Sequence, residues 1–229
     1  MIDFSKGDKS KERFRWRICV GVSGHRIPPK LPNEAVPALY TTVCQTLEIF
    51  NAETIAHTGV GDQIVVSSLA EGADTIVAEA GLKLGFRLEA ILPFRREEYA
   101  SDFKSQQAFA NYQHLLERAS AIHELGGNPL DRPHAYQAAG FAMLAKIDIL
   151  IAIWDGNPAD GVGGTGEIIE RAANHQITIL WSNPSQPSEI RILSVNPGST
   201  MILDPQHFEK PGPGRIASIV RQILGSRRN

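Results

Sequence analysis

The sequence has few of the features that mark membrane, secreted or nucleic-acid-binding proteins. None of its apolar runs approaches the roughly 20 residues that a membrane-spanning helix needs. Its two cysteines, Cys19 and Cys44, form neither a disulfide framework nor a zinc-ligand pattern. The formal net charge is −2, so no excess of positive charge points to a polyanionic partner. Together these absences favour a protein of the reducing cytoplasm.

The N-terminal segment is polar before the first apolar run, so it lacks the apolar region of a signal peptide. We expect residues 1–14 to form a flexible tail. The remaining residues, 15–229, are expected to form one domain, because 42% hydrophobic and 21% charged residues over 229 positions are ordinary for a single globular unit.

Apolar runs bounded by turn residues alternate with segments of helical period. The predicted strands are residues 15–22, 63–69, 87–93, 121–125, 148–154 and 177–182. The predicted helices are residues 33–50, 71–85, 107–119, 134–146, 165–175 and 215–226. Residues 184–199 look like a loop, and residues 200–203 like an edge strand. This alternation predicts an α/β protein, with a doubly wound, mostly parallel sheet and helices on both faces.

Three polar, glycine-containing turns follow predicted strands of this sheet. They are "SGHR" at residues 23–26, "SLAEGAD" at 68–74 and "WDGNPADGVGGTGE" at 154–167. Ligands of open parallel sheets bind beyond the carboxyl ends of the strands, where such turns converge. The three turns therefore predict one ligand site at this edge.

The third turn has the composition of a phosphate cradle. Gly161, Gly163 and Gly164 can point consecutive N–H groups at one anion. We expect Thr165 to cap the following helix, whose N-terminus favours negative charge. The alternative is that these glycines only permit a tight turn.

The first turn supplies further candidate ligand-binding residues: Ser23, Gly24, His25 and Arg26. Arg26 can bind a phosphate with two hydrogen bonds, and Ser23 can donate through its hydroxyl. A loop histidine such as His25 can equally be structural.

Acidic residues of the turns are the next candidates. Glu71, next to Gly72, has no local structural role and is a candidate for binding ribose hydroxyls, whereas Asp74 could cap its own helix. Asp155 and Asp160 flank the third turn, where they could hold Mg²⁺ together with a ligand phosphate. No other spacing in the sequence suggests a metal site.

Glu167 is the candidate catalytic residue. A carboxylate beside a phosphoribosyl group could stabilise or attack a developing positive charge at the anomeric carbon. Alternatively, it only complements the helix N-terminus. Tyr136 and Trp154 could stack on a base or belong to the core, and residues 95–99 could line the ligand mouth or start a solvated helix.

The motifs resemble those of known families. "SSLAEGADTIVAEAGLKLG" resembles a stretch of the DNA-uptake family of Smf and DprA, and "DILIAIWDG" with "GGTGEIIERAANHQITILW" resembles the nucleotide-binding edge of the Lonely Guy family. Together they identify the chain as similar to the SLOG superfamily, most closely to standalone bacterial members without assigned activity, over about residues 15–183. The resemblance implies a Rossmann-like fold, a nucleotide-derived ligand and a homodimer or higher homo-oligomer.

The sequence departs from the catalytic pattern of the Lonely Guy family. That family has Pro-Gly-Gly-x-Gly-Thr-x-x-Glu, whereas this chain lacks the proline and has only Gly166 between Thr165 and Glu167. Ala139 stands where those enzymes carry an arginine. Residues 135–183 also resemble nucleoside deoxyribosyltransferases, which place a glutamate nucleophile near the position of Glu167.

The leading prediction is therefore a nucleotide-binding protein, with a sensor role as one form of it. The alternative is a hydrolase or transferase that acts on an N-glycosidic bond through Glu167. Single-stranded DNA binding ranks third, because that role requires a basic groove and this chain is slightly acidic.

Overall fold

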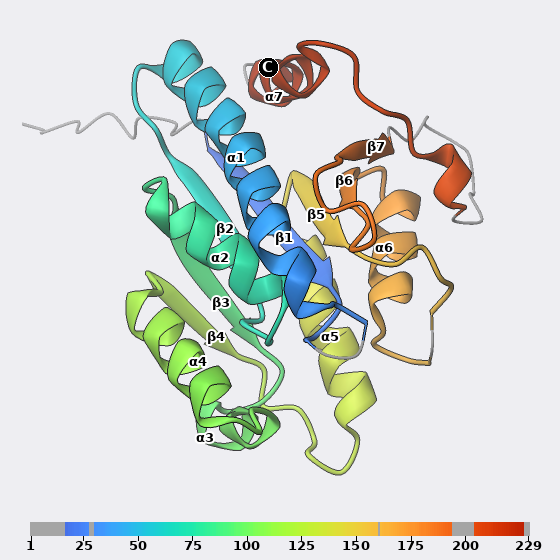
Figure 1. The fold of residues 1–229 in the computed structure, drawn as a ribbon. Coiled ribbons are helices and arrows are strands. Elements are labelled where there is room, and N and C mark those ends of the chain that lie inside the picture. Colours follow the sequence, from blue (N-terminus) through green and yellow to red (C-terminus); the bar gives the residue numbers. More distant parts are fainter. Residues whose placement is uncertain (1–16, 28–29, 160, 194–203, 227–229) are drawn as a thin grey trace, which may run out of the picture.

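The computed structural model describes residues 17–27, 30–159, 161–193 and 204–226. These residues form one seven-stranded sheet in the order β4-β3-β2-β1-β5-β6-β7 (Figure 1). The strands are β1 Ile18–Gly24, β2 Gln63–Ser67, β3 Arg87–Leu92, β4 Ala121–Glu124, β5 Ile149–Ile153, β6 Thr178–Ser182 and β7 Arg191–Leu193. All neighbouring strands are parallel except β6 and β7. The predicted α/β architecture is confirmed.

Helices follow or precede the parallel strands as crossover connections. The α-helices are α1 Val36–Thr58, α2 Ala73–Lys83, α3 Arg96–Tyr99, α4 Gln106–Arg118, α5 Arg132–Leu144, α6 Thr165–Asn174 and α7 Arg215–Ser226. Short 3₁₀ turns are Asn33–Ala35, Ala100–Asp102 and Pro205–His207. None of the helices in the described residues is long and apolar enough to cross a membrane.

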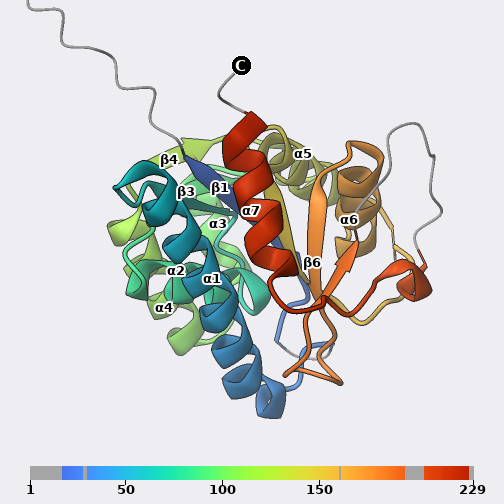
Figure 2. The same ribbon diagram turned by 90° about the horizontal axis from the view of Figure 1, so that it is seen from above.

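Helices cover both faces of the sheet, as Figure 2 shows from above. Strand side chains alternate between the faces because a strand repeats every two residues. Val20 and Val22 of β1 therefore belong to one buried cluster with residues of α1, α2, α4 and α7, whereas Leu150 and Ala152 of β5 belong to a second cluster with residues of α5 and α6. Two buried apolar layers thus hold the central strands.

Several predicted boundaries are wrong by a few residues. β1 continues beyond Val22 to Gly24, because Ser23 and Gly24 still pair with β5. The first helix starts at Val36 and continues to Thr58, where Gly59 ends it in the left-handed conformation. The helix predicted from Glu71 starts at Ala73.

The segment after β6 contains a strand that we expected to be a loop. Residues 191–193 form β7, which pairs antiparallel with β6 and bridges to Glu209 through Ile192. The helix predicted at residues 215–226 is confirmed as α7. The tail predicted at residues 1–14 and the edge strand predicted at 200–203 lie outside the described residues.

Candidate functional site

A cavity of about 250 Å³ lies beyond the carboxyl ends of the central strands. The chain order of the strands reverses between β1 and β5, which is where open α/β sheets bind their ligands. All three predicted turns contribute to its wall. The lining residues are Val22, Ser23, Gly24, His25, Arg26, Ser68, Ala70, Asp74, Pro93, Tyr99, Tyr136, Ala139, Gly140, Met143, Gly163, Gly164, Thr165 and Ile168.

The cavity brings together most, but not all, of the predicted ligand-binding residues. Those that line it are Ser23, Gly24, His25, Arg26, Gly163, Gly164 and Thr165. The residues outside the lining are Glu71, Gly72, Asp155, Gly161 and the candidate catalyst Glu167.

The β1 turn is fixed by backbone contacts to its neighbours. His25 donates its backbone N–H to Ile153, and its own carbonyl accepts from Ala73 at 3.1 Å. A Cβ atom on Gly24 would lie 2.4 Å from the Cβ of Ala73, so only glycine allows this approach. The turn therefore packs directly against the N-terminus of α2.

His25 is buried and paired with Asp155. Its Nε2 lies 2.9 Å from Oδ1 of Asp155. Burial raises the pKa of Asp155, but hydrogen bonds from His25 and from the backbone and side chain of Asn157 outweigh that effect and lower the pKa to about 2. Asp155 therefore orients His25 and braces the turn from outside the cavity.

The β2–α2 turn is held in a restricted conformation. Gly72, the residue before α2, has φ +102°, and a Cβ there would lie 2.4 Å from the carbonyl oxygen of His25. The buried Leu69 has φ +59°, which is uncommon for a residue with a side chain. Gly72 thus allows the β2–α2 turn to pack closely against the β1 turn.

Asp74 stabilises this turn and does not cap its own helix, contrary to the cap considered from the sequence. Its carboxylate accepts hydrogen bonds from the Ser67 hydroxyl at 2.9 Å and from the Ser68 N–H at 3.0 Å. Ser67 and Ser68 lie before α2. Asp74 itself is in the first turn of α2, and Gly72 occupies the cap position. Burial dominates the pKa of Asp74 and raises it from 3.8 to about 6, although the hydrogen bonds oppose this.

The raised pKa of Asp74 predicts a pH dependence of stability. Between pH 4 and 6 the folded state binds the proton more tightly than the unfolded state does, so the free energy of unfolding falls as pH rises through this range. The expected loss from this group is about 3 kcal/mol. Urea denaturation of the wild type and Asp74→Asn at several pH values measures it, because the variant should lack this part of the decline. Parallel pH profiles of the two proteins would contradict the prediction.

The glycine turn leads into α6 differently from our expectation. Thr165 does not cap the helix: it is the first helical residue, and Gly164, with extended φ and ψ, occupies the cap position. Gly163 has φ +75°, and a Cβ there would lie 2.4 Å from the carbonyl oxygen of Pro133. Gly163 therefore packs the turn against α5, and it lines the cavity together with Gly164 and Thr165.

Glu167 braces this turn from within. One carboxylate oxygen accepts the Gly163 N–H at 2.6 Å, and the other accepts a hydrogen bond from the Gln137 side chain. The Gly163 N–H is therefore engaged inside the protein, which leaves Gly164 and the first turn of α6 to face an anion. The contacts of Glu167 give it a structural role here.

Glu167→Gln is expected to lower the free energy of unfolding by about 1–2 kcal/mol, because it replaces a charged acceptor of a backbone N–H. Glu170→Gln, an exposed site on the same helix, is the matched control for urea denaturation. Unchanged stability together with loss of base release from a nucleotide would instead support the catalytic role.

The segment after β3 contributes Pro93 and Tyr99 to the cavity lining, and Tyr99 is one of the residues 95–99 that the sequence offered for the ligand mouth. Tyr99 and Phe103, after β3, are buried with ring centroids 5.4 Å apart. They anchor the short segment that carries Asp102. The position of this segment after a predicted strand suggested from the sequence that residues 95–99 could line the ligand mouth, but Asp102 was not among the predicted site residues.

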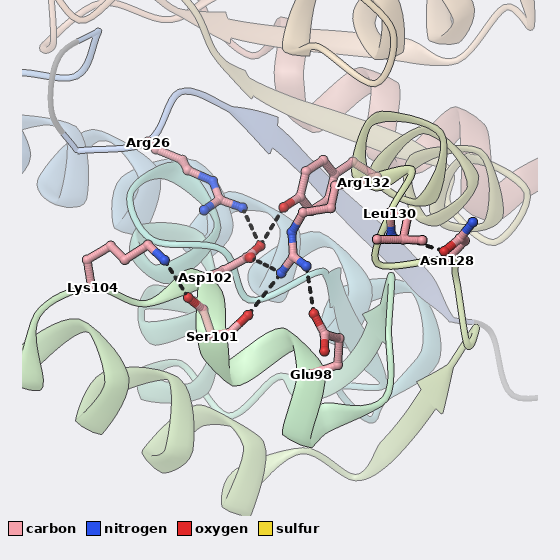
Figure 3. A network of polar contacts seen from close by, with 9 residues as sticks. Arg26, Glu98, Ser101, Asp102, Lys104, Asn128, Leu130 and Arg132 are labelled. Atoms are coloured by element: carbon pink, nitrogen blue, oxygen red, sulfur yellow. Dashed lines mark hydrogen bonds and ion pairs between the residues drawn. The ribbon is translucent and has the colours of Figure 1, made fainter.

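Asp102 is the centre of a polar network (Figure 3). Its carboxylate accepts a hydrogen bond from Arg26 at 3.3 Å, one from the Tyr136 hydroxyl at 2.7 Å and one from Arg132. Arg132 also donates to Glu98 at 2.6 Å. The network therefore ties the β1 turn to α5 at the mouth of the cavity.

The structure places Trp154, a residue that could stack on a base or belong to the core, whereas half of the suggested Mg²⁺ pair lies outside the described residues. Trp154 is a core residue, with 1% of its surface exposed and its indole N–H donated to the carbonyl of Asn157. In the described residues there is no group of three or more His, Cys, Asp or Glu side chains that could hold a metal ion. Asp160, the suggested partner of Asp155 in binding Mg²⁺, lies outside the described residues.

Comparisons with known proteins give distant similarities of fold. No family model and no curated protein matches the chain. DNA processing protein A (DprA) from Streptococcus pneumoniae is 16% identical, with a TM-score of 0.47, over 72% of this chain and 50% of that one. The structural genomics target TM1055 is 17% identical, with a TM-score of 0.37, over 74% of this chain and 95% of that one. The chain thus spans half the length of DprA, and neither similarity assigns it an activity.

Proposed function

We propose that this protein binds a nucleotide-derived small molecule in the cavity, with a phosphate group at the N-terminus of α6. The observation that carries this proposal is the convergence of Arg26, Ser23 and the Gly164–Thr165 turn on one cavity at the switch point of the sheet. The first N–H groups of a helix have no partner within the helix and attract anions. A phosphate is the anion that such a turn suits best.

Another part of the cavity lining suits the sugar or base. Tyr136, Ala139 and Met143 of α5 and Ile168 of α6 give it an apolar and aromatic surface. A cavity with apolar walls and a few polar groups is typical of small-molecule sites. Asp74 adds a carboxyl group beside the β2 turn, where sugar hydroxyls could donate to it.

A panel of nucleotides tests this proposal. It should include mono-, di- and triphosphates of each common base, cyclic nucleotides and ADP-ribose derivatives, first by thermal unfolding and then by calorimetric titration. At least one compound is expected to stabilise the protein, by about 2.7 kcal/mol at a hundredfold excess over its Kd. If no compound stabilises it at millimolar concentration, the proposal is wrong. A gel shift of single-stranded DNA at low salt would identify nucleic acid as the ligand instead.

A further inference from the structure

The positive charge of Arg26 at the cavity is paired with a buried carboxylate. Of the described residues that line the cavity, Arg26 is the one arginine or lysine. Its side chain is 41% exposed, whereas its partner Asp102 is only 6% exposed. The guanidinium group uses one nitrogen for Asp102, so its other N–H groups are available to a ligand.

The positive charge of a second arginine nearby, Arg132, is also neutralised by carboxylates. Arg132 is held by Asp102 and Glu98 together, and Asp102 also accepts the hydroxyl of Tyr136. The two guanidinium groups are therefore matched by two carboxylates. Asp74 contributes another carboxyl group to the cavity wall, and the carboxylate of Asp155 faces His25.

This balance has a consequence for the ligand. The N-terminus of α6 supplies about half a positive charge, which suits one phosphate group. Each further negative charge on the ligand would be attracted by Arg26 but repelled by Asp102, whose fixed position prevents it from moving away. Such a balance favours phosphates of low charge.

We propose that Asp102 is a positioning residue that sets the charge selectivity of the cavity: it holds Arg26 at the mouth and offsets its charge, so that multiply charged phosphates bind poorly. This inference rests on the proposed function. Asp102 acts through Arg26 and need not touch the ligand itself.

Titration with simple phosphates tests the inference without knowledge of the base. The probes are dimethyl phosphate, inorganic phosphate, pyrophosphate and tripolyphosphate, at pH 8 and constant ionic strength, followed by the NMR shifts of the Gly164 and Thr165 amides. Asp102→Asn keeps the side-chain shape and removes the charge. The ratio of wild-type Kd to variant Kd should increase by about threefold for each added negative charge on the probe.

Glu98→Gln is the matched control, because it changes the net charge equally but contacts Arg132 and not Arg26. Its Kd ratio should stay nearly constant across the four probes. A purely structural role of Asp102 would weaken all four probes alike, and such a flat ratio would overturn the inference.

Two further outcomes are distinguishable. If the wild type binds none of the probes and no nucleotide, the proposed function itself fails. If Asp102→Asn does not fold, the wild-type protein tests the selectivity by itself. Its affinity should not increase steeply from dimethyl phosphate to tripolyphosphate, and a steep increase would contradict the role of Asp102.

Discussion

Replacing Gly72 by alanine is expected to lower the free energy of unfolding by about 3 kcal/mol or more. Gly72 has φ +102° and ψ −120°, a backbone region that is essentially restricted to glycine. A Cβ atom would also lie 2.4 Å from the carbonyl oxygen of His25 and 2.9 Å from the Cα of Arg26. Because both contacts are with backbone atoms, no side-chain rotation can relieve them.

Gly85→Ala is the matched control for this prediction. Gly85 follows the other end of the same helix and has φ +84°, and a Cβ atom there would meet nothing within 4 Å beyond its neighbours in the chain. It therefore carries the conformational strain without the steric clash, and alanine there should cost about 1 kcal/mol. Chemical denaturation of both variants measures the difference. Equal losses would mean that the close approach of the two turns contributes little.

The Gly72 variant also connects stability with binding. The backbone that it would displace belongs to His25 and Arg26, which line the cavity. In any folded fraction of Gly72→Ala, nucleotide affinity should therefore decrease, whereas Gly85→Ala should bind as the wild type does. Unchanged affinity in a folded Gly72 variant would show that the β1 turn tolerates the shift.

The sequence predicted the fold well because its central strands are buried on both faces. Runs such as residues 149–153 are continuously apolar, which distinguishes parallel strands from the amphipathic helices between them. β7 was missed because three residues carry too little pattern, and its pairing with β6 depends on contacts distant in the chain. β7 therefore forms because of tertiary contacts and not because of its local sequence.

The candidate site was predicted in part for the same reason. Strand ends and glycines are visible in the sequence, so the convergence of the three turns on one sheet edge could be inferred from topology. Whether a residue faces the cavity or braces it depends on individual contacts, as Glu167 and Asp155 show. The contact of Asp102 with Arg132 joins residues 30 positions apart, and the local sequence does not predict it.

The replacement of Thr165 by aspartate should separate ligand binding from stability. Thr165 is the first residue of α6 and lines the cavity beside Gly164. A carboxylate at this position suits the helix N-terminus, so the free energy of unfolding should stay unchanged or increase by about 0.5 kcal/mol. The same carboxylate would repel a bound phosphate, and nucleotide affinity should fall by about a hundredfold, which corresponds to roughly 2.7 kcal/mol.

Thr165→Asn is the control for this experiment, because asparagine matches the shape of aspartate without its charge. Its affinity should fall by less than about fivefold, since only the hydroxyl and the local packing change. Calorimetric titration with the tightest-binding nucleotide measures both variants. Equal losses in the two variants would mean that side-chain shape causes the effect. If neither variant lost affinity, the ligand phosphate would not bind at the N-terminus of α6. A loss confined to Thr165→Asp would locate negative charge of the ligand at this turn, because the two variants differ there in little besides charge.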